Sequence, residues 1–356
     1  MGRLRGATVL LTCTGGVISP SHIQSLKVNP ENRIVKVVGV DSASPCIGQC
    51  LADKFYQVPF GTEPGYVERI LEICQKEYVD VIFPASHEEG LALARSEHVF
   101  AKNGITLAIS KADVLERSFN KQVAYQALKQ HGLPCPEFRV AKSVSEFEAA
   151  ASELGIDHKK VVMKPVLSRG GRGARILTKE SLANRFLSEK PGFLETSYDE
   201  AVRALSSLNP SAFPELVLME HLPGKIYSVD FLCKSGKALI VVPKVRVFGN
   251  PSQTIVGAVE KNAYIEGQVE KISQLFGFDY TVNIEFGCSE AGVPLPFDFN
   301  PRLAASTAFC SAAGANLIYY ALKLALGEQV PEVKVKDNVV MIRYFKEHYL
   351  GGILDV

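Results

Sequence analysis

The stretch Thr281-Val-Asn-Ile-Glu-Phe-Gly287 alternates apolar and polar residues, and Pro296-Phe-Asp-Phe-Asn-Pro-Arg302 does the same. This period of two is typical of half-buried β-strands, whose successive side chains point to opposite faces. Glu290-Ala-Gly292 lies between the two stretches and has the composition of a turn. The sequence therefore predicts an antiparallel hairpin near the C-terminal end of the chain.

The predicted hairpin brings acidic side chains together. A turn centred on Ala291-Gly292 places Glu285 opposite Asp298 and Asn283 opposite Asn300, all on one face. Like charges directly opposite on paired strands destabilise a sheet, so a positive group should lie between them. Carboxylate and amide oxygens suit Mg²⁺ better than zinc. The alternative is an ordinary amphipathic hairpin with a solvated acidic face.

A glycine-rich segment follows a short apolar strand. Val161-Val-Met-Lys-Pro165 runs into Leu167-Ser-Arg-Gly-Gly-Arg-Gly-Ala174, which carries two arginines. Glycines let backbone N–H groups approach phosphate oxygens closely, and Lys164 would add a point charge. The pattern is neither a Walker A loop nor GxGxxG. It predicts a phosphate-binding loop, with a mobile hairpin as the alternative.

A third motif, Leu216-Val-Leu-Met-Glu-His-Leu-Pro-Gly224, is a strand that breaks into a linker and fits an adenine-binding hinge. In this order the three motifs resemble the ATP-grasp superfamily, especially its carbamoyl-phosphate-synthase-like and amino-acid-ligase branches. The resemblance covers nearly the whole chain, up to Arg343-Tyr-Phe345. It implies an α/β fold whose α+β nucleotide lobes hold ATP between antiparallel sheets.

The resemblance also assigns residues to roles. It implies that Glu285, Asp298 and Asn300 bind Mg²⁺, with Mn²⁺ as the alternative ion. Arg302 would face the transferred phosphate and act as a catalytic residue together with Lys164. The implied ATP-binding residues are Lys121 and Lys164 on the phosphates, Ser168, Arg169, Gly170, Gly171, Arg172 and Gly173 in the loop over the β- and γ-phosphates, and Glu220 and Leu222 at the adenine hinge.

Two positions depart from the family pattern. Ile226 stands where an acidic residue usually binds the ribose hydroxyls, so another polar group or a water would have to replace that contact. Asp298 stands where the family's commonest metal ligand is glutamate, which is one methylene longer.

Composition limits the classes of function. The chain has 356 residues, 47% hydrophobic and 22% charged, which describes an ordinary globular protein of two or three lobes. A net charge of +1 gives no general attraction to nucleic acid or to a membrane surface. No apolar run is long enough for a transmembrane helix. The eight cysteines lack zinc-ligand spacing and predict thiols in a reducing cytoplasm.

Residues 1–112 predict a separate domain, because β-rich runs alternate with segments of helical periodicity. This pattern favours a parallel, Rossmann-like sheet. Thr14-Gly-Gly16 and Asp41 invite a dinucleotide interpretation, but the full glycine fingerprint is missing. The expected strands are Ala7–Cys13, Ile34–Val40 and Val79–Pro84, and the expected helices are Tyr66–Glu77 and Glu88–His98.

Ligands bind beyond the carboxyl ends of strands in such sheets. Ser86-His-Glu-Glu89 follows a strand at that edge, so Ser86 and Glu88 are candidate contacts to an acceptor substrate. The alternative is that Ser86 caps a helix whose first turn is acidic.

The rest of the chain divides into two further regions. Residues 113–190 are expected to hold a helix from about Ala112 to His131 and a small lid lobe, and residues 191–356 the larger nucleotide- and metal-binding lobe. In the latter, Lys244 and Arg246 are one strand period apart and face the same way. They could bind an anionic substrate or form an exposed cationic edge.

The resemblance implies an ATP-dependent ligase that converts a carboxylate into an acyl phosphate for attack by an amine. The expected partners are small carboxylates and amines, with a homodimer as the expected assembly. Three alternatives stay open: carboxyphosphate chemistry on bicarbonate, a non-catalytic ATP-binding module, and a nicotinamide-dependent oxidoreductase.

Overall fold

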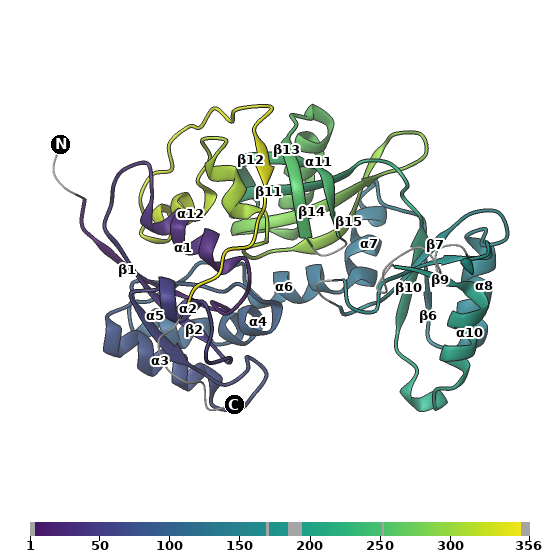
Figure 1. Ribbon diagram of the computed structural model, residues 1–356, viewed down its shortest axis with the longest axis horizontal. Helices are drawn as coiled ribbons and strands as arrows, with labels where there is room; N and C mark the ends of the chain where they lie inside the picture. The colour runs from purple at the N-terminus through teal and green to yellow at the C-terminus, as the bar shows by residue number, and fades with distance from the viewer. Residues whose placement is uncertain (1–3, 169–170, 184–193, 251–252, 350–356) are drawn as a thin grey trace.

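The computed structural model describes residues 4–168, 171–183, 194–250 and 253–349. Three sheets organise these residues, two of five strands and one of six. In Figure 1 the N-terminal sheet lies below the six-stranded sheet, and the other five-stranded sheet lies to one side of both. The helices α6 and α7 occupy the space where the three regions meet.

The first sheet is parallel throughout, in the order β3-β2-β1-β4-β5. The predicted Rossmann-like domain is confirmed, although the expected helix Glu88–His98 is two shorter helices. Its strands are β1 (Ala7–Leu11), β2 (Val35–Asp41), β3 (Lys54–Gln57), β4 (Val81–Phe83) and β5 (Thr106–Leu107), and its helices are α1 (Ser19–Lys27), α2 (Gly48–Leu51), α3 (Tyr66–Glu77), α4 (His87–Arg95) and α5 (Glu97–Lys102).

The order of strands reverses between β1 and β4, which is where open parallel sheets bind ligands. The dinucleotide interpretation of this edge fails for a local reason. The N–H of Gly15 donates to Asp41 Oδ2 at 2.7 Å, and the N–H of Ala43 donates to Asp41 Oδ1 at 2.8 Å. A carboxylate thus already occupies the backbone donor of Gly15 that a pyrophosphate would need.

The single helix expected over 112–131 is wrong. The structure has α6 (Ala112–Phe119) and α7 (Lys121–Gln130), separated at Asn120. Asn120 leaves helical geometry (φ −81°, ψ 105°), and its side chain accepts a hydrogen bond from the N–H of Val123 at 3.0 Å. Because an asparagine cap satisfies an otherwise unpaired helix N–H, it starts a new helix here. Lys121 therefore lies at a helix N-terminus.

The second sheet has the order β6-β10-β7-β8-β9. It includes two strands from beyond residue 190, so the small lobe extends past the expected boundary between 113–190 and 191–356. That boundary itself lies outside the described residues. The elements of this small lobe are β6 (Phe138–Ala141), α8 (Val144–Glu153), β7 (Val161–Pro165), β8 (Arg175–Thr178), β9 (Glu195–Ser197), α10 (Tyr198–Ser206), η1 (Pro210–Ala212) and β10 (Leu216–Glu220).

The third sheet is antiparallel, in the order β15-β14-β11-β12-β13-β16. Its strands and the associated helices form the large lobe. They are β11 (Ile226–Lys234), β12 (Lys237–Asn250), β13 (Gln253–Val259), α11 (Ala263–Phe276), β14 (Tyr280–Cys288), β15 (Pro294–Asn300), η2 (Thr307–Ser311), α12 (Leu317–Ala325) and β16 (Val340–Ile342).

The predicted hairpin is β14 and β15, and its register is confirmed at the acidic end. Glu285 pairs with Asp298, and Asn283 pairs with Asn300. Nearer the turn the register shifts by one, since Phe286 pairs with Pro296. Phe297 is the extra residue of this β-bulge, and a bulged residue is left without ladder hydrogen bonds.

One apolar core joins the first domain to the large lobe. Leu11 and Phe83 of the parallel sheet belong to the same buried cluster as Leu317 and Tyr320 of α12. The helices α1 and α12 lie against each other above that sheet (Figure 1). Across 4–349, apart from the three internal gaps named above, no helix is long and apolar enough to cross a membrane.

Candidate functional site

The opposed carboxylates of β14 and β15 each have a cationic partner. Asp298 Oδ1 lies 3.4 Å from Lys121 Nζ, and Glu285 Oε1 lies 2.9 Å from Arg246 Nη2. These cations come from α7 and from β12, which β11 separates from the hairpin in the sheet. Each carboxylate is thus paired with its own cation from the chain, which argues against the alternative of a solvated acidic face.

The pKa values of the two carboxylates are shifted in opposite directions. Burial is the main cause that raises the pKa of Glu285 to about 7; the charge of Arg246 opposes this rise, and the nearby charge of Asp298 adds to it. Burial also opposes the charge of Asp298, but Lys121 and Lys164 outweigh it and hold the pKa of Asp298 below its ordinary value. Glu285 is therefore the carboxylate whose charge remains incompletely compensated.

Lys164 joins the small lobe to the bulge. Its Nζ donates to the carbonyl of Phe297 at 3.0 Å and lies 5.0 Å from the centre of the Phe297 ring. The hydroxyl of Tyr125 on α7 donates to the same carbonyl at 2.7 Å. Burial, with the charge of Lys121 added, lowers the pKa of Lys164 to about 7. The carbonyl freed by the bulge thus holds three regions together.

The start of α7 is attached to the glycine-rich segment. The N–H of Lys121 donates to the carbonyl of Val166 at 3.1 Å, and Lys121 Nζ donates to the carbonyl of Ser168 at 3.0 Å. Gly173 has a φ of +73°, and a Cβ there would come within 2.7 Å of Pro165. Glycine is required at that position on both counts. Of the predicted loop residues, Arg169 and Gly170 lie outside the described part of the chain.

Asn300, Arg302 and His87 form a second group at the end of β15. Arg302 Nη2 donates to Asn300 Oδ1 at 2.9 Å, and Asn300 Nδ2 donates to Asp298 Oδ2 at 3.0 Å. Nε of Arg302 is buried and has no hydrogen-bond partner in the described chain. This buried donor is available to a bound anion.

His87 is a site residue that we did not nominate. Its Nε2 lies 3.2 Å from Asn300 Oδ1, and its ring stacks on Phe119 with centroids 4.0 Å apart. Burial, together with the charge of Arg302, lowers the pKa of His87 to about 3, so the ring is neutral near pH 7. The segment Ser86-His-Glu-Glu89 carried the signal, because it follows a strand at the ligand-binding edge of the sheet.

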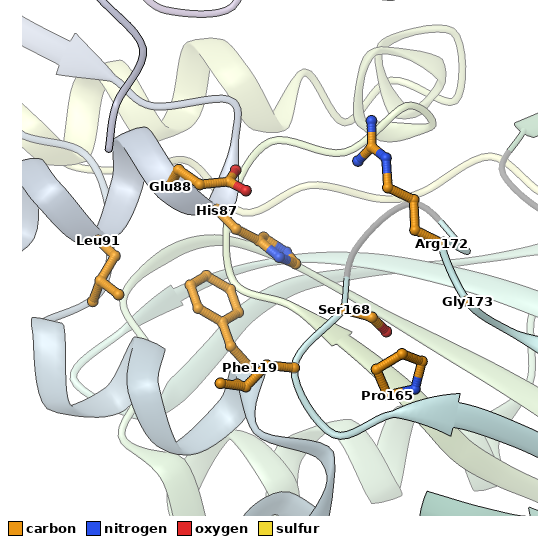
Figure 2. Close-up of a pocket in the computed structure, with 9 residues that line it drawn as sticks. His87, Glu88, Leu91, Phe119, Pro165, Ser168, Arg172 and Gly173 are labelled. Atoms are coloured by element: carbon orange, nitrogen blue, oxygen red, sulfur yellow. The ribbon is translucent and has the colours of Figure 1, made fainter. Parts of the chain in front are cut away.

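The two residues that flank His87, Ser86 and Glu88, have different roles. Ser86 is the N-cap of α4 and accepts from the N–H of Glu89, so the capping interpretation is confirmed. Glu88 instead borders a cavity of about 470 Å³ between α4, Phe119 and the glycine-rich turn (Figure 2).

The segment predicted as an adenine hinge joins the end of β10 to the start of β11. Glu220 ends β10, and its carboxylate accepts from the N–H of Glu137 at 2.9 Å. Leu222 is buried against the large lobe. Ile226 begins β11, so the position of the usual ribose-binding acid lies on a strand next to the hinge.

Lys244 is not part of an exposed cationic edge, so that interpretation is wrong. Its ammonium already has a partner. It is buried and bonds to the buried carboxylate of Asp230. Burial opposes its charge, but Asp230 prevails and raises the pKa of Lys244. Arg246, its partner in that prediction, is the residue paired with Glu285.

Asp230 holds the segment that follows Arg302. It accepts hydrogen bonds from Ser306 Oγ at 2.7 Å and from Thr307 Oγ1 at 2.6 Å, and Asn283 Nδ2 lies 3.1 Å away. The hydroxyl of Thr307 in turn accepts from the N–H of Ala304 at 2.9 Å. This buried network fixes the backbone just beyond Arg302, and sequence patterns gave no sign of it.

The residues at the hairpin fit a hard divalent cation. In the described part of the chain no three His, Cys, Asp or Glu side chains cluster closely enough to hold a metal. The available donors are therefore two carboxylates, Glu285 and Asp298, with the amide oxygen of Asn300. Oxygen-only donors suit Mg²⁺, and the poorly compensated charge of Glu285 would favour a cation.

Two lobes meet over a pair of lysines, one lobe carrying a glycine-rich turn and the other the opposed carboxylates. This arrangement is typical of proteins that bind a nucleotide between two lobes. Family models agree. An ATP-grasp domain matches residues 119–278, and "ATP-grasp in the biosynthetic pathway with Ter operon" matches 212–348. The chain belongs to the ATP-grasp superfamily. Its residues 10–108 match a PylC-like N-terminal domain.

Curated relatives include the large chain of carbamoyl phosphate synthase. This chain is 24% identical to that of Pseudomonas putida over 322 residues, covering 84% of this chain and 27% of the relative. It is 26% identical to that of Archaeoglobus fulgidus over 298 residues, covering 80% and 26% respectively. The chain spans about a quarter of the length of these relatives.

Solved structures share the fold. N5-carboxyaminoimidazole synthetase from Staphylococcus aureus, complexed with ADP, has a TM-score of 0.70 at 17% identity, covering 97% of this chain and 84% of that one. Biotin carboxylase from Campylobacter jejuni has a TM-score of 0.69 at 16% identity, covering 93% and 74% respectively. At such identities the likeness establishes the fold alone.

The unequal carboxylates give a first prediction. The pKa of Glu285 is raised in the folded protein, so its ionisation opposes folding. The free energy of unfolding therefore falls as pH rises from 4.5 to about 7, and at pH 8 this destabilisation is complete. In EDTA at pH 8, Glu285→Gln should raise the free energy of unfolding by about 1–3 kcal/mol. Asp298→Asn should lower it, because Lys121 loses its partner. Urea unfolding of both variants measures this, and a shift in the same direction for both would contradict it.

The buried network gives a second prediction. Asp230→Asn leaves the ammonium of Lys244 buried without a counter-charge, so unfolding free energy should fall by about 3–5 kcal/mol. The double variant Asp230→Asn with Lys244→Met removes both charges and should recover most of that loss. Urea unfolding at pH 7.5 compares them. An equal loss in the single and double variants would mean that the ion pair is not the source of the effect.

Proposed function

We propose that this protein is an ATP-dependent ligase that activates a substrate carboxylate as an acyl phosphate for attack by an amine. The observation that carries the proposal is a pair of opposed carboxylates whose charges are countered by cations: Lys121 and Arg246 form ion pairs with them, and the charges of Lys164 and Arg302 act on Glu285 as well. Support also comes from relatives named carbamoyl phosphate synthase large chain and from a neighbouring structure complexed with ADP.

The proposed reaction has two steps. A carboxylate oxygen attacks the γ-phosphorus of ATP, the bond from that phosphorus to the β–γ bridging oxygen breaks, and ADP leaves. The amine nitrogen then attacks the acyl carbon, the carbon–oxygen bond to phosphate breaks, and inorganic phosphate leaves while the nitrogen loses a proton. Neither step requires a covalent bond to the protein.

The residues of the site would position and neutralise the reacting groups. Lys121 and Lys164 are proposed to hold the phosphates, and Arg302 to donate to the transferred phosphoryl oxygens. Glu285, Asp298 and Asn300 are proposed to hold Mg²⁺, which when bound neutralises charge on the phosphate oxygens. Such electrostatic assistance is most effective where water is excluded, and Lys121 and Lys164 are buried.

Adenine recognition is proposed at the hinge, through the backbone of Leu222 and the segment that begins with Glu220. Ser168, Gly171, Arg172 and Gly173 are proposed to contact the β- and γ-phosphates. The test of the whole proposal is ADP release from Mg·ATP in pools of organic acids, amino acids and bicarbonate, each with and without amines. ADP release dependent on bicarbonate alone would favour carboxyphosphate chemistry, and no release with any pool would contradict ligase activity.

The lysine of β7 gives a third prediction. Lys164→Ala should weaken Mg·ATP binding at least tenfold, because a charge-assisted contact is worth about 1.5–3 kcal/mol. Lys179→Ala is the matched control, since Lys179 lies just after β8 in the same lobe and pairs with Asp157 near the surface. Isothermal titration calorimetry measures both variants. Wild-type affinity in Lys164→Ala would remove this lysine from the site.

The arginine after β15 gives a fourth prediction. Arg302→Lys should keep most ATP affinity yet lose about 100-fold or more in kcat, because a lysine cannot replace a planar fork of donors in the transition state. Arg343→Lys is the control, since Arg343 also donates to this segment, at the carbonyl of Ala305. Trapping of the acyl phosphate with hydroxylamine gives the readout. Undiminished hydroxamate from Arg302→Lys would show that it does not assist phosphoryl transfer.

A further inference from the structure

The face of the large-lobe sheet that carries Glu285, here called the site face, extends from the carboxylates to the hinge. Gly287 is two residues beyond Glu285 on β14, so the two positions face the same way. On the neighbouring β11, Ser228 pairs with Glu285 and Ile226 pairs with Gly287. Residues that pair on adjacent strands share a face, so Ile226 belongs to the site face. It lies one strand period closer to the hinge than the carboxylates do.

Apolar side chains surround Gly287 on the site face. A Cβ at Gly287 would come within 2.8 Å of the side chain of Leu222 and 3.4 Å of Ile226 Cδ1. Leu295 of β15 pairs with Gly287 from the other side. Ile226 and Leu295 are half-buried, so part of each side chain is open to a ligand. We call Leu222, Ile226 and Leu295 the apolar platform.

The polar side chains on either side of Ile226 are directed elsewhere. Lys225 Nζ donates to Glu260 Oε1 at 3.0 Å, and the hydroxyl of Tyr227 donates to the same oxygen. Successive side chains of a strand point to opposite faces, so these two lie on the face opposite the platform. Neither is directed at a ligand on the site face.

The small lobe presents a second apolar surface to the site. Val162 is two residues before Lys164 on β7 and so faces the same way. Because Lys164 Nζ reaches the carbonyl of Phe297, this face of β7 is directed toward the large lobe. Val162 packs against the buried cluster that contains Leu222.

A nucleotide with its phosphates at Lys164 and its base at Leu222 lays its sugar on the platform, because the sugar joins the two. We propose that this site accepts ATP and its deoxyribose analogues about equally, with Ile226 as the residue that leaves the sugar hydroxyls unread. The inference rests on the proposed function and specifies its nucleotide. A site that hydrogen-bonds a hydroxyl rejects the analogue that lacks it, whereas an apolar surface distinguishes the two only weakly.

Isothermal titration calorimetry of the unmodified protein with Mg²⁺ tests this, using ATP, 2′-deoxyATP and 3′-deoxyATP. Both deoxy analogues should bind within about threefold of ATP, since no hydrogen bond is lost with either hydroxyl. Binding of either analogue about tenfold or more weakly than ATP would overturn the inference and leave the ligase function intact. No binding of any of the three nucleotides would overturn the proposed function itself.

Variants at Ile226 test where the sugar lies. Ile226→Glu adds an acceptor for the sugar hydroxyls, so ATP should bind about fivefold or more tightly than 2′-deoxyATP, although the added charge weakens binding of both. Ile226→Leu is the matched control and should keep the ratio of the two affinities near one. Ile226→Gln adds a polar group without charge and gives the same comparison where the carboxylate abolishes binding. A ratio that stays near one in the polar variants would contradict the placement of the sugar on Ile226.

Discussion

The architecture of the site depends on one backbone carbonyl, that of Phe297. A β-bulge in β15 leaves this residue without a partner in the ladder, and a buried carbonyl without a partner is costly. Tyr125 from α7 and Lys164 from β7 both donate to it. Since the next residue is Asp298, the same irregularity that recruits a lysine also sets the position of a carboxylate.

Charge balance is the second constraint on this arrangement. Two carboxylates opposite each other on paired strands require cations, and the chain brings Lys121 and Arg246 to them from different elements. Those cations are in turn costly to bury. The site is therefore a mutually compensating set whose members are individually unfavourable, which is typical of sites that bind charged ligands.

Local patterns predicted the elements better than the contacts between them. The pairing of Glu285 with Asp298 was predicted correctly, although two deviations cancel to produce it. Next to the turn, where Cys288 pairs with Pro294, the register is shifted by one residue from the expected one, and the extra residue of the bulge then shifts it back. The helix break at Asn120 was missed, because an asparagine inside an amphipathic pattern can be either a cap or a surface residue. The Asp230–Lys244 pair and the contact of His87 with Asn300 join segments far apart in the chain, and no local periodicity encodes them.

The carbonyl of Phe297 has a consequence for the ammonium of Lys164. An ammonium carries three hydrogens and this carbonyl accepts one of them, so the contact fixes the direction of the lysine without using up its capacity to donate. A sequence that straightened the bulge would return the carbonyl to the ladder of the sheet and leave the ammonium without an anchor, trading a preorganised group for a freer one.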